Sequence, residues 1–315
     1  MRDLPAATEA SAFHGSLNEE KESEGTDETA MKNSPQKEDT STRAKRKLSS
    51  LANRGMRAAL ERTSVQKIYE AMVWSQIRGG PIPEHIGVIL DGNRRWARSR
   101  GLDPWKGHEQ GARKMEDFLD WCGEIDEIRS VTLYAFSTEN FKRSEKEVYE
   151  IFRLLKQYLN SLLKDERVVK NEIRVKMLGR IEMLPQEFQD LIRQVEEKTA
   201  DYRKKYFNFA IAYGGRTEIV DAVRSLARTI KEQEIGLEDI NERLIESYLY
   251  TAHLPKCSPD LIIRTSGEVR LSNFLTWQGA YSELCFVDVY WPDFRKLDLL
   301  RAIRMYQHRQ RRFGG

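Results

Sequence analysis

The chain has 315 residues, of which 52 are basic and 49 acidic, and its formal net charge is +3. This near balance gives no strong signal for a polyanionic partner, so we expect no nucleic-acid binding. Hydrophobic residues make up 40% of the chain, which is enough for a substantial core. No apolar run approaches the roughly 20 residues that span a bilayer, and the N-terminus lacks a signal-peptide core. We expect a cytoplasmic protein, with peripheral contact at a membrane surface as the alternative.

Residues 1–47 differ in composition from the rest of the chain. They are rich in Glu, Lys, Ser, Thr and Asn, and Phe13 is their only aromatic residue. Such a segment cannot bury enough apolar surface to offset its conformational entropy, so it is predicted to be a disordered polar tail. The basic cluster at residues 43–47 is read as a solvated charge run, with contact to anionic lipid or nucleic acid as the alternative.

Residues 48–79 are predicted to be an amphipathic helical segment. Apolar residues recur there at three- and four-residue steps and form one stripe: Val65, Ile68, Tyr69, Met72, Val73 and Ile77. We expect this stripe to dock against the main domain, with a membrane-surface helix as the alternative. Glycine and proline at 79–83 then break the helix, and the main domain is expected to occupy residues 80–315.

The main domain alternates short apolar runs with stretches of helical period. The strand-like runs are 86–90, 131–136, 173–178, 207–213, 261–264 and 284–289, and the helical stretches include 144–170, 185–204, 217–234 and 298–312. This alternation predicts a single α/β domain with a six-stranded, mostly parallel sheet flanked by helices. Ligands of such sheets bind beyond the carboxyl ends of the strands.

Polar residues suited to phosphate chemistry follow two of these strands. The turn in 260–274 presents Arg264, Arg270 and Ser272, and guanidinium and hydroxyl groups around a glycine suit a diphosphate. The turn in 91–96 also carries a carboxylate, Asp91, which belongs in a phosphate site when a divalent metal separates the two anions. Two phosphate sites predict an enzyme that joins two diphosphate substrates. The alternative for Asp91 is a cap on the next helix.

Six sequence motifs in this chain resemble the motifs of one protein family. They are DGNRRWA (91–97), GHEQG (107–111), YAFSTENF (134–141), YGGR (213–216), IRTSGEVRLSNFLTWQ (263–278) and AYSELCFVDVYWPDF (280–294). Their order and wording resemble the cis-prenyltransferases, from about residue 80 to the C-terminus. The resemblance implies an Mg²⁺-dependent enzyme that condenses isopentenyl diphosphate with an allylic prenyl diphosphate. It further implies a polyprenyl diphosphate product that serves as a lipid carrier for glycans.

The resemblance also implies roles for individual residues. Asp91 would be catalytic and would bind Mg²⁺ with Glu283, and Ser137 and Asn140 would lie near the condensing carbons and help to remove the proton. Arg264, Arg270 and Ser272 would bind isopentenyl diphosphate. The remaining substrate-binding positions are Gly92, Asn93, Arg94, Arg95, Trp96, His108, Phe136 and Arg143.

Plainer roles remain open for several of these residues. His108 would otherwise be a surface histidine, Arg143 an exposed residue at a helix start, and Phe136 and Trp96 core aromatic residues. One position departs from the family, because Pro104 stands where an arginine usually precedes the histidine. Lys106 and Arg100 are the candidates to replace that arginine.

The helix predicted over 144–170 has an apolar stripe that includes Ile151, Leu155 and Leu159. Such a stripe is ordinarily core, but each added five-carbon unit of an isoprenoid gains roughly 4 kcal/mol by leaving water, at about 0.8 kcal/mol per methylene. We therefore expect the helices to enclose an apolar tunnel of which this stripe is one wall.

The C-terminal segment resembles the R-x-G motif of the family, through Arg312 and Gly314. In the family this motif reaches the diphosphates of the neighbouring subunit, so a homodimer with shared sites is expected. A non-catalytic partner subunit is the alternative function, but such relatives tend to lose the carboxylate at Asp91 and the RTSGExR run, and this chain has both.

Overall fold

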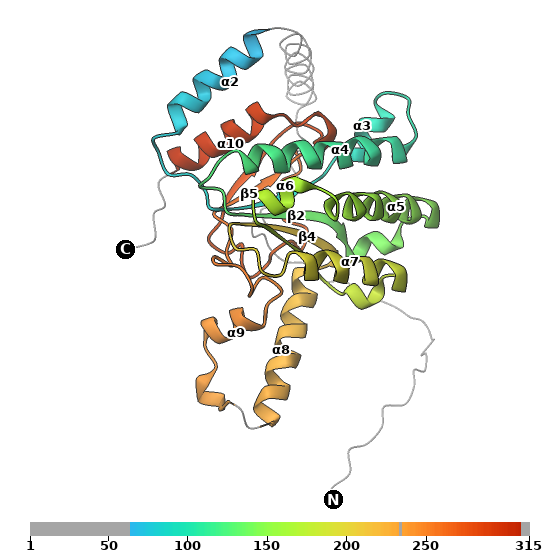
Figure 1. Ribbon diagram of the computed structural model, residues 1–315, viewed down its shortest axis with the longest axis vertical. Coiled ribbons are helices and arrows are strands. Elements are labelled where there is room, and N and C mark those ends of the chain that lie inside the picture. The colour runs from blue at the N-terminus through green and yellow to red at the C-terminus, as the bar shows by residue number, and fades with distance from the viewer. Residues whose placement is uncertain (1–63, 233–234, 310–315) are drawn as a thin grey trace, which may run out of the picture. The chain divides into compact units, whose positions relative to one another are not determined.

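The computed structural model describes residues 64–232 and 235–309 (Figure 1). Within them lies a six-stranded sheet built from β1 (His85–Ile89), β2 (Ser130–Ser137), β3 (Ile173–Leu178), β4 (Lys205–Tyr213), β5 (Leu261–Arg264) and β6 (Glu283–Phe286). The strand order is β3-β4-β2-β1-β5-β6, and every neighbouring pair is parallel. The predicted single α/β domain with a six-stranded sheet is confirmed. The predicted disordered tail at 1–47 lies outside the described residues.

Helices lie on both sides of this sheet (Figure 1). The described helices are α2 (Ser64–Ile77), α3 (Asn93–Arg98), α4 (Pro104–Gly123), α5 (Glu145–Leu162), α6 (Glu166–Lys170), α7 (Gln186–Lys198), α8 (Gly215–Lys231), α9 (Glu242–Tyr248) and α10 (Lys296–His308). Helices α4, α5, α7 and α10 lie on one side, whereas α8 and α9 extend from the other. The helix predicted over 144–170 is in fact two helices, because Asp165 caps a new start at α6. Helix α4 was not predicted, although Asp103 at its N-cap and Pro104 at its first position are a typical helix start.

Both faces of the central strands β4, β2, β1 and β5 are largely buried, which explains their continuous apolar runs, whereas β3 alternates buried and half-buried residues and β6 is half-buried. Ile86 and Val88 of β1 point into the core under α4, α5, α7 and α10. Ile89 points to the opposite face, where it packs with Phe274 and Leu275 from the segment between β5 and β6. This two-sided burial holds the carboxyl ends of the central strands in fixed positions.

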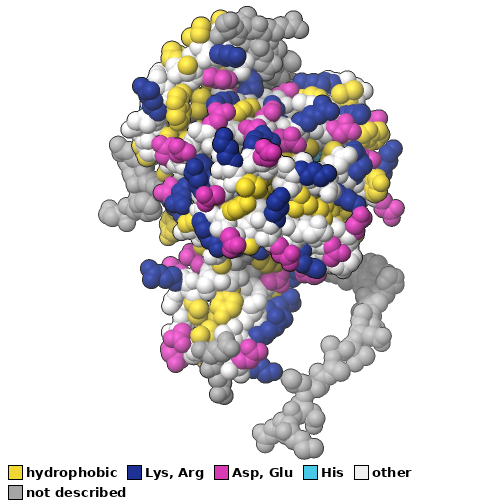
Figure 2. All heavy atoms as spheres, viewed as in Figure 1, with side chains coloured by type: hydrophobic (Ala, Val, Ile, Leu, Met, Phe, Trp, Pro, Cys, Tyr) yellow, Lys and Arg dark blue, Asp and Glu magenta, His cyan; other side chains and the backbone are white. Residues whose placement is uncertain are grey.

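The apolar stripe predicted on α2 is only partly buried. Val73 and Ile77 are fully buried, and α2 packs against α10, but Val65, Ile68 and Met72 are exposed. Apolar side chains are visible along α2 at the upper left of Figure 2. Among the described elements, α2 packs extensively only against α10, so only the face of α2 that is turned toward α10 is covered. Across the rest of the face shown in Figure 2, basic and acidic side chains are interspersed.

A chain of buried polar groups crosses the sheet near its amino end. The Nε2 atom of His85 lies 2.8 Å from Oγ1 of Thr132, Nδ2 of Asn208 donates to the same oxygen at 3.2 Å, and Nε2 of His253 lies 2.9 Å from Oδ1 of Asn208. Burial lowers the pKa of His85 and of His253 to about 4, and for His253 the nearby charges of Lys176 and Arg174 add to the effect. Both imidazoles are therefore neutral in the folded protein near neutral pH.

We expect the free energy of unfolding to fall as the pH drops from about 6.5 to about 4. These histidines take up protons near pH 6.5 in the unfolded chain but only near pH 4 in the folded chain. Their contribution to the free energy of unfolding is therefore complete above pH 6.5 and is lost as the pH falls to about 4. At 1.36 kcal/mol per pKa unit, the loss is on the order of 3 kcal/mol per histidine. Urea unfolding measured from pH 7 to pH 4.5 checks this. His253→Gln should flatten the pH dependence, and His308→Gln, at an exposed position, should leave it unchanged; equal profiles for all three proteins would contradict the assignment.

Candidate active site

A cavity of about 570 Å³ opens beyond the carboxyl ends of β1 and β2. The described polar residues on its wall include Asp91, Asn93, His108, Ser137, Glu139, Asn140, Arg143, Arg264, Ser272 and Asn273. Strands β1 and β5 are neighbours, but the chain leaves β1 toward β2 and leaves β5 toward β6. Such a reversal of strand order creates a crevice at the strand ends, and Asp91 and Arg264 lie at it.

The turn after β1 depends on Gly92. Its φ of 102° is strained for any other residue, and an added Cβ would lie 2.8 Å from Cδ1 of Tyr290. Gly92 is also the N-cap of α3, so Asp91 does not cap that helix and the capping alternative is wrong. The Asp91 carboxylate is instead free to face the cavity.

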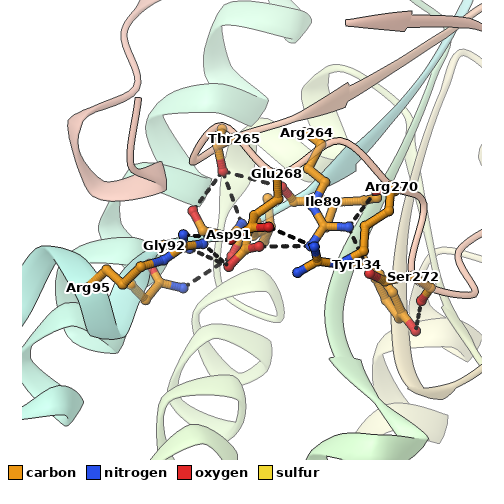
Figure 3. A network of polar contacts seen from close by, with 12 residues as sticks. Ile89, Asp91, Gly92, Arg95, Tyr134, Arg264, Thr265, Glu268, Arg270 and Ser272 are labelled. Carbon is orange, nitrogen blue, oxygen red and sulfur yellow. Dashed lines mark hydrogen bonds and ion pairs between the residues drawn. The ribbon is translucent and has the colours of Figure 1, made fainter. Parts of the chain in front are cut away.

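Two arginines from different elements converge on Asp91 (Figure 3). Nη2 of Arg264 donates to Oδ2 at 2.9 Å, and Nη2 of Arg95 lies 3.3 Å from Oδ1. Burial alone would raise the pKa of Asp91, but the hydrogen bond from Arg264 and the charges of Arg95 and Arg264 outweigh it and lower that pKa. Asp91 is therefore an ionised carboxylate held between two cations.

The network continues through Glu268 to the outer side of the turn (Figure 3). Glu268 accepts from Nη1 of Arg95 at 2.8 Å and from Nη1 of Arg270 at 2.7 Å, so it links these two arginines. The side chain of Arg270 is 60% exposed and Arg270 is not part of the cavity wall, whereas that of Arg264 is 5% exposed. Nη1 of Arg264 also donates to Oγ of Ser272 at 2.7 Å.

Two polar atoms in this turn are buried without a hydrogen-bond partner in the described part of the chain. They are Nε of Arg264 and Oγ of Ser266. Buried polar atoms are nearly always hydrogen-bonded, so the unpaired Nε of Arg264, a residue of the cavity wall, is suited to an oxygen atom of a ligand, whereas Ser266 is not on that wall. This condition fits a phosphate-bearing ligand beside Asp91.

A second group of basic side chains lies on the side of the cavity formed by α4 and the start of α5. His108 and Arg143 are both on the wall, and their side chains are 11% and 24% exposed. His108 is therefore not a surface histidine, and Arg143 is not an exposed residue at a helix start. Both contact the carboxylate of Glu147, which is also 3.6 Å from Nη1 of Arg94.

Ser137 and Asn140 lie together at the end of β2. Oδ1 of Asn140 accepts from the backbone N–H of Ser137 at 3.1 Å, and the two side chains form a capping box on the 3₁₀ turn Thr138–Lys142. They face the cavity, but this cap gives them a structural role as well. Phe136 turns the other way: it is 1% exposed, packs against Phe141 and Phe152, and is not on the cavity wall. Tyr134 and Ala135 are on the wall instead, and an irregular register with β4 between Tyr134 and Phe136 breaks the alternation of the strand, so Phe136 is a core residue.

The glycines of the GHEQG motif allow α3 and α4 to approach closely. A Cβ on Gly107 would lie 2.0 Å from the backbone oxygen of Asn93, and one on Gly111 would lie 2.4 Å from Oδ1 of Asn93. The GHEQG motif therefore lets α4, which carries His108, pack closely against α3, which carries Arg94 and Arg95.

Other predicted site residues are not brought to the cavity. The register pairs Glu283 with Leu261, at the opposite end of β5 from Arg264, and Glu283 accepts from Arg309 at 2.9 Å. The structure does not bring Asp91 and Glu283 of one chain together, because Glu283 lies at the opposite end of β5 from the strand ends that carry Asp91 and Arg264. Trp96 donates to Asp293 at 2.7 Å and is off the cavity wall. Arg312 and Gly314 lie outside the described residues.

The replacements suggested for the missing arginine do not reach the cavity either. Pro104 is the first residue of α4, which explains why a proline is tolerated there. Lys106 pairs with Glu109, and Arg100 pairs with Asp293 and lies over the ring of Trp96.

One side of the cavity is apolar. It is formed by residues of α4 and α5 together with the end of β1: Ile89, Ala112, Met115, Ile151, Leu154 and Leu155. Ile151 and Leu155 belong to the stripe predicted for a tunnel wall.

Glu147, Glu139 and Asn273 were not predicted as site residues. The Ser144-x-x-Glu147 spacing is that of an ordinary capping box, so it does not by itself indicate a functional residue.

The chain matches the family model described as putative undecaprenyl diphosphate synthase over residues 89–314. It is 52% identical over 248 residues to a tritrans,polycis-undecaprenyl-diphosphate synthase (geranylgeranyl-diphosphate specific) of Thermoplasma volcanium, covering 79% of this chain and 95% of the relative. The Archaeoglobus fulgidus protein of the same name is 52% identical over 244 residues, with 78% and 96% covered.

Solved structures of similar proteins agree with this family match. Lavandulyl diphosphate synthase from Lavandula x intermedia, in complex with dimethylallyl diphosphate, superposes with a TM-score of 0.71 at 36% identity, covering 74% of this chain and 99% of that one. A probable undecaprenyl diphosphate synthase from Campylobacter jejuni gives 0.60 at 34% identity, with 75% and 100% covered. The match over the domain that carries the cavity shows that this chain belongs to the undecaprenyl diphosphate synthase family and is a cis-prenyltransferase that elongates prenyl diphosphates.

Proposed function

We propose that the enzyme is Mg²⁺-dependent and condenses isopentenyl diphosphate with geranylgeranyl diphosphate to give a long polyprenyl diphosphate. The observation that carries this proposal is one cavity whose wall combines Arg264 beside Asp91, Arg143 and His108 beside Glu147, and an apolar side. The choice of primer and product length follows the names of relatives that are about half identical to this chain.

The residues around Asp91 fit a magnesium ion. Mg²⁺ is usually bound through one or two carboxylates together with substrate phosphates and water, so it does not need a cluster of protein ligands. Asp91 is ionised and on the cavity wall, and no group of three or more potential metal ligands is found among the described residues. When bound, the ion would neutralise the diphosphate that leaves the allylic substrate.

The side chains of this chain then supply binding and orientation. His108 and Arg143 donate to the allylic diphosphate, and Arg264 and Ser272 donate to isopentenyl diphosphate from the other side of Asp91. Ser137 and Asn140 lie between these groups on the wall, where they orient the carbon from which the proton is lost. The apolar wall of α4 and α5 accepts the growing chain. Catalysis here is mainly positioning together with stabilisation of negative charge.

Turnover with a panel of primers tests the proposal. The protein is incubated with Mg²⁺, labelled isopentenyl diphosphate and allylic diphosphates of increasing length, and the products are sized. We expect the highest kcat/KM with geranylgeranyl diphosphate and loss of turnover when Mg²⁺ is chelated. A clear preference for a shorter primer would overturn the choice of substrate, and full activity in chelator would overturn the metal.

Three further parts of the proposal concern the setting of the reaction. The product would serve as a lipid carrier for glycans, and a homodimer would bring Arg312 and Gly314 of one subunit to the diphosphates of the other. The apolar product suggests work near a membrane, with contact at its surface. No helix in the described ranges is long and apolar enough to cross a bilayer.

A further inference from the structure

Glu147 is a carboxylate on which three basic side chains of the site converge. It accepts from Nη1 of Arg143 at 2.8 Å, lies 3.1 Å from Nε2 of His108, and lies 3.6 Å from Nη1 of Arg94. His108 and Arg143 are on the cavity wall, but Glu147 is not. The carboxylate therefore contacts these two residues from behind the wall.

Helix capping does not account for this arrangement. Ser144 is the N-cap of α5 and Glu147 the third residue of the helix, the spacing at which a glutamate usually reaches back to the cap. The serine half of the motif is formed, since the N–H of Glu147 donates to Oγ of Ser144 at 3.4 Å. The carboxylate itself is bonded to the side chains of Arg143 and His108.

The carboxylate is ionised and can only accept hydrogen bonds. The hydrogen bond with His108 lowers the pKa of Glu147 to about 2, against an opposing effect of burial, with further help from the charges of Arg143 and Arg94. An acceptor at this place requires a proton on Nε2 of His108, so Nδ1 is the ring nitrogen left for a ligand, and it donates to a phosphate oxygen in the imidazolium form, which carries a proton on both nitrogens.

We infer that Glu147 is a positioning residue that holds His108 and Arg143 at fixed places in the cavity wall so that both can donate to one diphosphate. The inference rests on the proposed function, in which these two residues bind the allylic diphosphate. A long arginine side chain has many rotamers, and a partner that fixes it before the ligand arrives lowers the entropy lost on binding. Glu147 thus acts through its neighbours and not by contact with the substrate.

Glu147→Gln tests this, because it keeps the shape and removes the charge. We expect the KM for the allylic diphosphate to rise about tenfold or more, since two charged hydrogen bonds are weakened, while the KM for isopentenyl diphosphate changes less than about twofold. Binding of inorganic diphosphate, measured by calorimetry, should weaken by a similar factor. The matched control is Glu145→Gln, which makes the same change at an exposed position in the first turn of the same helix and should leave both KM values unchanged.

A double substitution separates positioning from a structural role. In a His108→Gln background, Glu147→Gln should cost much less than it does alone, because one of the side chains it positions is gone. Full additivity would overturn the inference, as would equal increases in both KM values or an equal effect of Glu145→Gln. Tighter binding of diphosphate by Glu147→Gln would show that the carboxylate competes with the ligand, which also overturns it.

Folding is checked by the melting temperature of each variant. If Glu147→Gln does not fold, Glu147→Asp keeps the charge but shortens the side chain by one methylene, and it should raise the KM for the allylic diphosphate in the same direction; an unchanged KM would reject positioning. Absence of turnover by the unsubstituted enzyme with every primer would instead contradict the proposed function.

Discussion

Asp91→Asn is expected to reduce chain elongation at least about a thousandfold, equivalent to roughly 4 kcal/mol in the transition state, while the protein stays folded. The substitution keeps the size of the side chain but removes the charge that Arg264 and Arg95 hold at the cavity wall. The proposed magnesium ion would lose its protein carboxylate. Initial rates over a range of Mg²⁺ concentrations, together with the melting temperature, measure both effects.

Asp120→Asn is the control for this substitution. Asp120 also pairs with an arginine, Arg167, but it is exposed on α4 and is not on the cavity wall. Its replacement should leave the rate within about twofold, because an exposed ion pair contributes little. A near-normal rate for Asp91→Asn at saturating Mg²⁺, with an unchanged melting temperature, would remove Asp91 from the metal role.

Gly107→Ala is expected to damage both stability and activity. Its Cβ would meet the backbone oxygen of Asn93 at 2.0 Å, and since backbone cannot swing aside, α3 and α4 must move apart. Overpacking of this kind typically costs about 1–3 kcal/mol, or about 2–4 °C in melting temperature per kcal/mol for a domain of this size. The shift also separates His108 from Arg94, and misplaced binding groups cost at least about tenfold in rate.

The same helix supplies the matched substitution. Gly123 is the last residue of α4, and nothing lies within 4 Å of a Cβ built on it. Gly123→Ala should keep full activity and gain up to about 1 kcal/mol in stability from better helix propensity. Differential scanning calorimetry and the elongation assay compare the two variants. If Gly107→Ala melted and turned over like Gly123→Ala, the close contact of α3 with α4 would not matter.

The sheet could be predicted from the sequence because strand periodicity is local. A strand lies in each of the six runs expected: β1, β2, β4 and β5 are largely buried on both faces and leave a continuous apolar pattern, whereas β3 leaves an alternating one. The placement of Asp91 and Arg264 followed from the rule that parallel strands end at one edge. Helix α4 is not among the predicted helical stretches, although Asp103 and Pro104 mark its start.

The sequence by itself determined the α/β class, the family through its linked motifs, and the strand ends at which polar residues gather. Only the tertiary structure decided which of those residues meet. Glu147 and His108 are 39 residues apart and touch because α4 and α5 pack together, whereas Glu283 and Asp91, both in family motifs, lie at opposite ends of the sheet. Periodicity records which face of an element is buried, but an ion pair between elements depends on their relative position and register, which the core packing of the whole domain sets.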